Sequence, residues 1–173
     1  MEVTRLSDAL GAYVSGVDLG NVDAGAADKI REAFYEHQIL LFRGQDISME
    51  QHIAFSKNFG PLEVHISKDS LHDDHEEILL VSNKKENGAY IGVENAGDSW
   101  HSDLSYMPEP SLGSLLYALE VSEIGGDTEW LNMYDAYDTL PEETKQRIDG
   151  LKARHSFNRY KNNRIGVPSQ RQE

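Results

Sequence analysis

The chain has 173 residues, of which 39% are hydrophobic, 30 are acidic, 16 are basic and none is cysteine. This length suits one domain with a sizeable core. The formal net charge of -14 disfavours binding to DNA or anionic lipid, because like charges would have to approach one another. The lack of cysteine excludes disulfides, thiolate metal sites and a cysteine nucleophile. Residues 1–20 contain no apolar signal core and no apolar run is long enough to span a bilayer, which predicts a cytoplasmic protein.

The first sixty residues predict two strands that alternate with two helices. Residues 12–18 alternate loosely and predict a short strand, and the apolar run 38–42 predicts a buried one. Between them, apolar positions recur with the spacing of one helical face, at Ile30, Ala33, Phe34 and His37. Ser48 and Gln51 form a capping-box pattern that opens the second helix, and Gly60 followed by proline ends it.

The rest of the chain favours strands. Short β-favouring segments separated by turn residues are predicted at 78–81, 89–93, 114–121, 128–131 and 151–157, with one helix from Pro141 to Gly150. Helices followed by closely spaced strands indicate an α+β fold with a sandwich or barrel of antiparallel strands. A roll of this kind needs about eight strands. The sequence supplies fewer, so the sheet is expected to be unfinished.

The C-terminal segment carries charge of the opposite sign to the rest of the chain. Residues 151–172 contain six basic residues and no acidic one. One interpretation is a solvated strip that pairs with the acidic body. The other is a mobile basic segment that meets a small anionic ligand, since so short a strip on so acidic a body makes a poor nucleic-acid site.

A His-x-Asp pattern at His101 and Asp103 is a candidate metal site. On a strand, side chains two residues apart point to the same face, so the imidazole and the carboxylate can converge on one ion. They would supply two of the three ligands of a 2-His-1-carboxylate triad, which leaves iron positions open. The alternative is a hydrogen-bonded histidine at the end of a strand.

A second His-x-Asp pattern begins at His72 and is followed by His75 and further acidic residues. Its neighbours are typical of a polar loop that enters a strand. We therefore expect solvated surface there, with adventitious metal binding as the alternative.

Five motifs occur together and in order along the chain. They are Gly-Val-Asp-Leu at 16–19, Ile-Leu-Leu-Phe-Arg at 39–43, Phe-Gly-Pro-Leu at 59–62, Asp-Ser-Trp-His-Ser-Asp-Leu-Ser-Tyr at 98–106 and Gly-Gly-Asp-Thr-Glu-Trp at 125–130. With them the chain resembles the N-terminal and central part of the taurine dioxygenase and 2,4-dichlorophenoxyacetate dioxygenase family. The resemblance implies a double-stranded β-helix (a cupin-like jelly roll) with flanking helices, and iron(II)- and 2-oxoglutarate-dependent chemistry.

The resemblance also implies roles for particular residues. His101 and Asp103 match the first two iron ligands, and Thr128 matches a threonine that hydrogen-bonds a carboxylate of 2-oxoglutarate. His65 matches a region that faces the primary substrate, and Asn95 is a further candidate for the pocket wall. The alternatives are an ordinary strand residue for Thr128 and a surface histidine for His65.

Two parts of the family's site have no clear counterpart in the sequence. The distal iron-binding histidine and the arginine that pairs with 2-oxoglutarate lie well downstream in the family. A compact site could use His155 as third ligand and Arg164 as carboxylate partner. However, relatives carry a similar His-x-Phe stretch that is not a ligand, so we expect a truncated domain over residues 1–173 instead, in which residues 151–173 form a mobile basic lid.

Together these inferences predict a dioxygenase that hydroxylates a small, anionic organic substrate with oxygen and releases succinate and carbon dioxide. Its partners would be small molecules, with no nucleic acid or membrane, and the family implies a possible homo-oligomer. The alternatives are a non-catalytic fragment that keeps the fold, in which the 173 residues alone are inactive, and a cupin-like hydrolase or isomerase that uses another metal.

Overall fold

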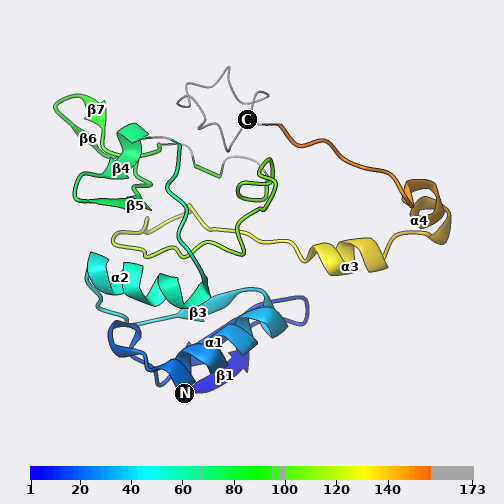
Figure 1. Cartoon of the computed structure of the whole chain (residues 1–173), viewed down its shortest axis with the longest axis horizontal. Coiled ribbons are helices and arrows are strands. Elements are labelled where there is room, and N and C mark those ends of the chain that lie inside the picture. Colours follow the sequence, from blue (N-terminus) through cyan, green and yellow to red (C-terminus); the bar gives the residue numbers. More distant parts are fainter. Residues whose placement is uncertain (67, 95, 98–99, 157–173) are drawn as a thin grey trace. The chain divides into compact units, whose positions relative to one another are not determined.

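A computed structural model describes residues 1–66, 68–94, 96–97 and 100–156 (Figure 1). The chain divides into two compact units. The first consists of Met1–Asn58 and Leu116–Lys152, and the second contains Phe59–Leu115 together with the residues from 153 on. Each unit is described by itself.

The first unit is built on a three-stranded sheet in the order β1-β2-β3 (Figure 1). Strand β1 (Glu2–Arg5) runs antiparallel to β2 (Ala12–Ser15), and β2 runs parallel to β3 (Leu40–Phe42). A parallel pair needs a crossover connection, which here contains helix α1 (Ala24–His37). The predicted helix and both predicted strands are confirmed. The parallel pairing of β2 with β3 was not expected from the sequence. Strand β3 is half-buried, whereas a buried strand was predicted.

The core of the first unit lies between α1 and the sheet. Ile30 on α1 and Val14 on β2 are the largest fully buried side chains among the described residues. Ala27 and Ala33, on the same side of α1 as Ile30, are also buried. The i, i+3 spacing of these apolar residues explains why one side of the helix is removed from water.

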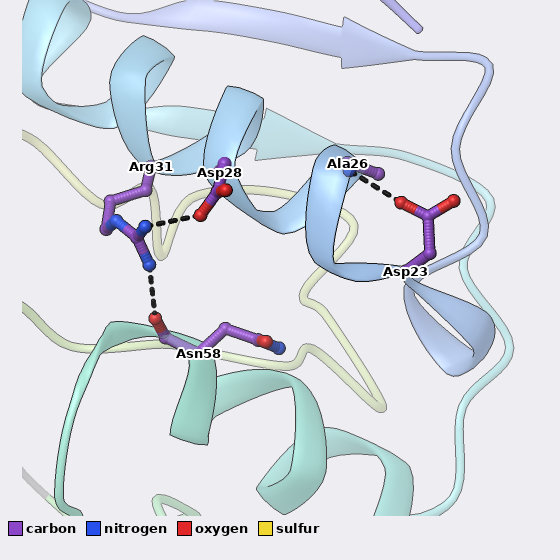
Figure 2. A network of polar contacts seen from close by, with 5 residues as sticks. All are labelled: Asp23, Ala26, Asp28, Arg31 and Asn58. Carbon is purple, nitrogen blue, oxygen red and sulfur yellow. Dashed lines mark hydrogen bonds and ion pairs between the residues drawn. The ribbon is translucent and has the colours of Figure 1, made fainter.

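Polar contacts hold α1 at its N-terminus and in its middle (Figure 2). Asp23 caps α1, because its carboxylate accepts a hydrogen bond from the backbone N–H of Ala26 at 2.7 Å. Farther along the helix, Arg31 pairs with Asp28 and also donates to the backbone carbonyl of Asn58 at 3.0 Å. Arg31 thereby ties α1 to the short 3-10 turn Lys57–Phe59.

Helix α2 (Met49–Ser56) begins with the capping box that the sequence predicts. The Ser48 hydroxyl accepts from the backbone of Gln51 at 3.2 Å, and the Gln51 side chain accepts from the backbone of Ser48 at 2.8 Å. The ring of Phe55 meets that of Phe42 on β3 edge-on, with 6.1 Å between centroids. A second 3-10 turn, Leu19–Asn21, precedes α1.

The second unit contains two small hairpins (Figure 1). The 3-10 turn Lys68–Ser70 leads into β4 (Leu71–His72), which pairs with β5 (His75–Leu79), and β6 (Lys85–Glu86) pairs with β7 (Ala89–Tyr90). The second His-x-Asp pattern therefore forms the turn of a hairpin. The predicted strands at 78–81 and 89–93 are confirmed only in part, since β5 starts earlier and β7 ends earlier.

Three predicted strands are wrong within the part of the chain that the structure describes. Residues 114–121, 128–131 and 151–156 form no strand there. A strand exists only where a neighbouring backbone completes its hydrogen bonds, and β-favouring residues do not supply that neighbour. Instead the segment exposes large apolar side chains: Leu116, Leu119, Val121, Ile124, Trp130 and Leu131.

Two short helices follow this segment. Helix α4 (Glu142–Ile148) confirms the helix predicted after Pro141, whereas α3 (Met133–Asp138) was not predicted. Asn132 caps α3 by accepting hydrogen bonds from the backbones of Tyr134 and Asp135. None of the helices in the described residues has the length and apolar character that crossing a bilayer requires.

Candidate functional site

His101 and Asp103 face one another in the second unit. Nε2 of His101 lies 3.1 Å from Oδ1 of Asp103, and the two side chains are 45% and 53% exposed. The predicted convergence is thus present, but the predicted strand is not, because Asp103 opens a turn. The two side chains therefore approach one another from a segment without regular structure that leads into a turn, where a strand was expected.

The turn after Asp103 is held in an uncommon backbone conformation. Leu104 has a φ of 49°, in the left-handed region that side chains other than glycine rarely adopt. Its carbonyl accepts a hydrogen bond from the backbone of Met107 at 2.9 Å, and Met107 is buried. Burial of Met107 and this hydrogen bond hold the turn that begins at Asp103.

Ser114 contacts the other oxygen of the same carboxylate. Its hydroxyl donates to Oδ2 of Asp103 at 2.5 Å. Each oxygen of the carboxylate therefore has a different neighbour, His101 on one side and Ser114 on the other. The sequence pattern did not identify Ser114, because it lies eleven residues beyond Asp103 and outside every recognised motif.

The spacing of His101 and Asp103 fits two adjacent ligands of one metal ion. Nitrogen and oxygen ligands about 2.1 Å from a metal, at right angles to each other, are about 3 Å apart. The observed separation of 3.1 Å between Nε2 and Oδ1 agrees with that edge. An imidazole with a carboxylate is also the donor set of non-haem iron sites.

His65 lies within the electrostatic reach of this pair. Burial lowers the pKa of His65 below its ordinary value, and the charge of Asp103 acts in the opposite direction with a smaller effect. His65 is half-buried. The structure therefore brings three of the predicted site residues into one region of the second unit, and the imidazole of His65 favours its neutral form there.

The other predicted residues are placed differently. Thr128 belongs to the first unit, where its side chain is exposed in a segment without regular secondary structure. Asn95 lies outside the described residues, as does Arg164. The roles predicted for these residues stay predictions.

His155 does not complete the metal site in the described part of the chain. Its Nδ1 lies 3.0 Å from the hydroxyl of Ser105, a contact that the sequence also did not indicate. No three histidine, aspartate or glutamate side chains among the described residues are grouped so that they could hold a metal ion. The hairpin turn at His72 and His75, whose rings are 5.3 Å apart, forms no such group either.

Comparison with known proteins places this chain in a family. Residues 2–173 match the family described as "Taurine catabolism dioxygenase TauD, TfdA family". The chain belongs to this dioxygenase family, as the resemblance of its motifs implied.

Two relatives that are named for an enzymatic activity are 40% and 33% identical to the chain over their aligned parts. Pentalenolactone F synthase of Streptomyces avermitilis is 40% identical over 167 residues, which are 91% of this chain and 53% of the relative. The (S)-phenoxypropionate/alpha-ketoglutarate-dioxygenase of Sphingobium herbicidovorans is 33% identical over 95% of this chain and 56% of its own length. The chain thus spans about half the length of the curated relatives it matches.

Solved structures of the same kind confirm the fold class. A taurine dioxygenase from Burkholderia xenovorans superposes with a TM-score of 0.75 at 31% identity, covering 90% of this chain and 53% of that one. AAD-2 in complex with Mn(II) and N-oxalylglycine gives a TM-score of 0.69 at 30% identity, covering 98% and 59%. The chain is therefore part of an α+β jelly-roll fold of the TauD type, of which the described residues contain only small sheets.

Proposed function

We propose that this chain forms part of an iron(II)- and 2-oxoglutarate-dependent dioxygenase that hydroxylates a small, anionic organic substrate. The observation that carries the proposal is the 3.1 Å approach of His101 Nε2 to Asp103 Oδ1 in a chain of this family. The names of relatives support the substrate class, because phenoxypropionate and 2,4-dichlorophenoxyacetate are both organic anions.

His101 and Asp103 are the proposed metal ligands. When bound, iron(II) supplies the redox chemistry that couples oxygen to the decarboxylation of 2-oxoglutarate into succinate and carbon dioxide. The imidazole of His101 would offer a nitrogen ligand, and Asp103 a carboxylate oxygen. Thr128 would hydrogen-bond a carboxylate of 2-oxoglutarate.

His65 and Asn95 are the proposed contacts to the primary substrate. The half-buried position of His65 beside Asp103 supports its proposed role as a substrate contact. A neutral imidazole at this place can donate one hydrogen bond and accept another, which suits an oxygen-rich substrate. Asn95 rests on the family resemblance alone.

The third ligand and the arginine partner of 2-oxoglutarate are proposed to lie in a further half of the domain. Two observations support this part. The relatives are about twice as long as the matched region, and the segment from Leu116 to Leu131 exposes apolar side chains that a complete roll would cover. Residues 151–173 are proposed, on their sequence alone, as a mobile basic lid that attracts an anionic substrate or co-substrate; of these, residues 157–173 lie outside the described residues.

The partners are proposed to be small molecules and oxygen in the cytoplasm. We propose no nucleic-acid or anionic-membrane partner, and the net charge of -14 supports this because it would repel both. Assembly into a homo-oligomer rests on the family resemblance.

The decisive experiment measures succinate formed from 2-oxoglutarate by the protein that carries the whole domain. We expect turnover only with iron(II) and oxygen, and we expect His101→Ala to abolish it. His72→Ala, in the other His-x-Asp pattern, is the matched control and should retain activity. Undiminished succinate formation in His101→Ala contradicts the assignment, and activity that survives strict exclusion of oxygen favours a cupin-like hydrolase or isomerase.

A further inference from the structure

We propose that Ser114 is a positioning residue that orients the Asp103 carboxylate for metal binding. The inference rests on the proposed function, since it assumes that Asp103 is a ligand. Its basis is the hydrogen bond from the Ser114 hydroxyl to Oδ2, on the opposite oxygen from the one that faces His101.

The carboxylate needs such a partner because its own torsion is soft. The χ2 angle of aspartate is broad, so the backbone of the turn does not by itself fix the plane in which the two oxygens lie. With both side chains about half-exposed, burial does little to choose between orientations. A donor fixed to Oδ2 selects the orientation in which Oδ1 lies 3.1 Å from Nε2 of His101.

The same contact favours binding of the metal through one oxygen. An oxygen that accepts a hydrogen bond from Ser114 has a lone pair already directed at the hydroxyl, which leaves Oδ1 as the better ligand. A carboxylate that binds through one oxygen occupies one coordination position, whereas a bidentate carboxylate occupies two. The family's chemistry needs open positions for the co-substrate and oxygen, so Ser114 would help to keep them open.

Ser114 comes from outside the motif that supplies the ligands. It lies in an exposed segment beside Leu112 and Leu115, and the sequence gives its hydroxyl no other evident role. Hydrogen-bond partners of ligating carboxylates commonly tune metal affinity without touching the metal. The hydroxyl of Ser114 can tune metal binding in this way, because it donates a hydrogen bond to the Asp103 carboxylate.

The test compares Mn(II) binding by the protein that carries the whole domain and by its Ser114 variants. Calorimetry measures the affinity, and the line broadening of the His101 ring signal in NMR spectra shows that the metal is at this site. We expect Ser114→Ala to weaken Mn(II) binding about tenfold, the lower end of the effect usual for such partners. Ser111→Ala, three residues earlier in the same segment, is the control and should bind as the wild type does.

A pair of variants of equal shape separates orientation from packing. Threonine keeps the hydroxyl and valine replaces it with a methyl group, so we expect Ser114→Thr to restore the wild-type affinity and Ser114→Val to resemble alanine. In the absence of metal, the melting temperatures of Ser114→Thr and Ser114→Val should be the same.

Two results would overturn the proposal in distinguishable ways. Equal Mn(II) affinity in wild type, Ser114→Ala and Ser114→Val contradicts the role of Ser114 and leaves the ligand assignment standing. Absence of any Mn(II)-induced broadening of His101 in the wild type contradicts the metal site itself, and with it the role of Ser114.

Discussion

The hydroxyl of Tyr117 donates a hydrogen bond to the backbone carbonyl of Gln45 at 3.1 Å, across 72 residues of sequence. The same hydroxyl accepts from the backbone of Ile47 at 3.4 Å. The side chain of Gln45 in turn accepts from Leu19 at 2.9 Å and donates to Val17 at 3.2 Å. Tyr117 therefore holds the loop before α2, which also anchors the turn before α1.

Replacing Tyr117 by phenylalanine should lower the stability of the first unit. The variant removes both hydrogen bonds and leaves a part-buried carbonyl without its donor, so we expect a loss of about 1 kcal/mol in the free energy of unfolding. Urea unfolding, monitored by circular dichroism, measures this loss in the free energy of unfolding. Tyr134→Phe, at a largely exposed tyrosine, is the control, and an equal loss there would contradict the argument.

His52 makes the stability depend on pH. Its ring packs against that of Tyr117 with 5.9 Å between centroids, and burial lowers its pKa below the ordinary value of 6.5. The unfolded chain then binds the proton more readily than the folded one does. The stabilising contribution is therefore complete above pH 6.5 and falls as the pH decreases from there through the lowered pKa.

We expect this dependence to be smaller in His52→Gln, which cannot titrate. Urea unfolding of wild type and variant at pH 7.5 and 5.5 would measure it, because contributions from other groups cancel in the difference between the two proteins. A wild-type stability that decreases no more than that of the variant would refute the prediction.

Gly92 occupies a position in the second unit that allows no side chain. A Cβ there would lie 2.5 Å from the carbonyl oxygen of Leu80, which accepts a hydrogen bond from Val93 at 2.8 Å. Gly92→Ala should push the two segments apart and cost about 1–3 kcal/mol. Gly25→Ala within α1 meets only the tip of a side chain and should not destabilise. Thermal unfolding distinguishes the two, and an unchanged melting temperature for Gly92→Ala would count against the close approach.

Ser48 should be required for the start of α2. Ser48→Ala removes the acceptor for the backbone of Gln51 and should lower stability by about 1 kcal/mol. Ser48→Asp keeps an acceptor at the cap and should recover most of that loss. Chemical denaturation of the three proteins tests this, and equal stabilities would show that the cap is dispensable.

Features that depend on residues close together in sequence were predictable. The capping box spans four residues, and the buried side of α1 follows from apolar residues three apart. The pairing of His101 with Asp103 is likewise local, and the motifs around it identified the family. The predictions of strands at 114–121 and 128–131 were wrong because a strand depends on a distant neighbouring strand that local composition does not reveal.

The sequence by itself therefore determined the family, the local elements and the two candidate ligands, because each rests on interactions within a few residues or on a motif. Only the tertiary structure decided the parallel pairing of β2 with β3, the turn that begins at Asp103, and the hydrogen bond from Ser114. The pairing and the hydrogen bond bring together groups that are eleven or more residues apart. The direction of a hydroxyl or the partner of a strand follows from how the backbone packs, and no pattern of neighbouring residues encodes it.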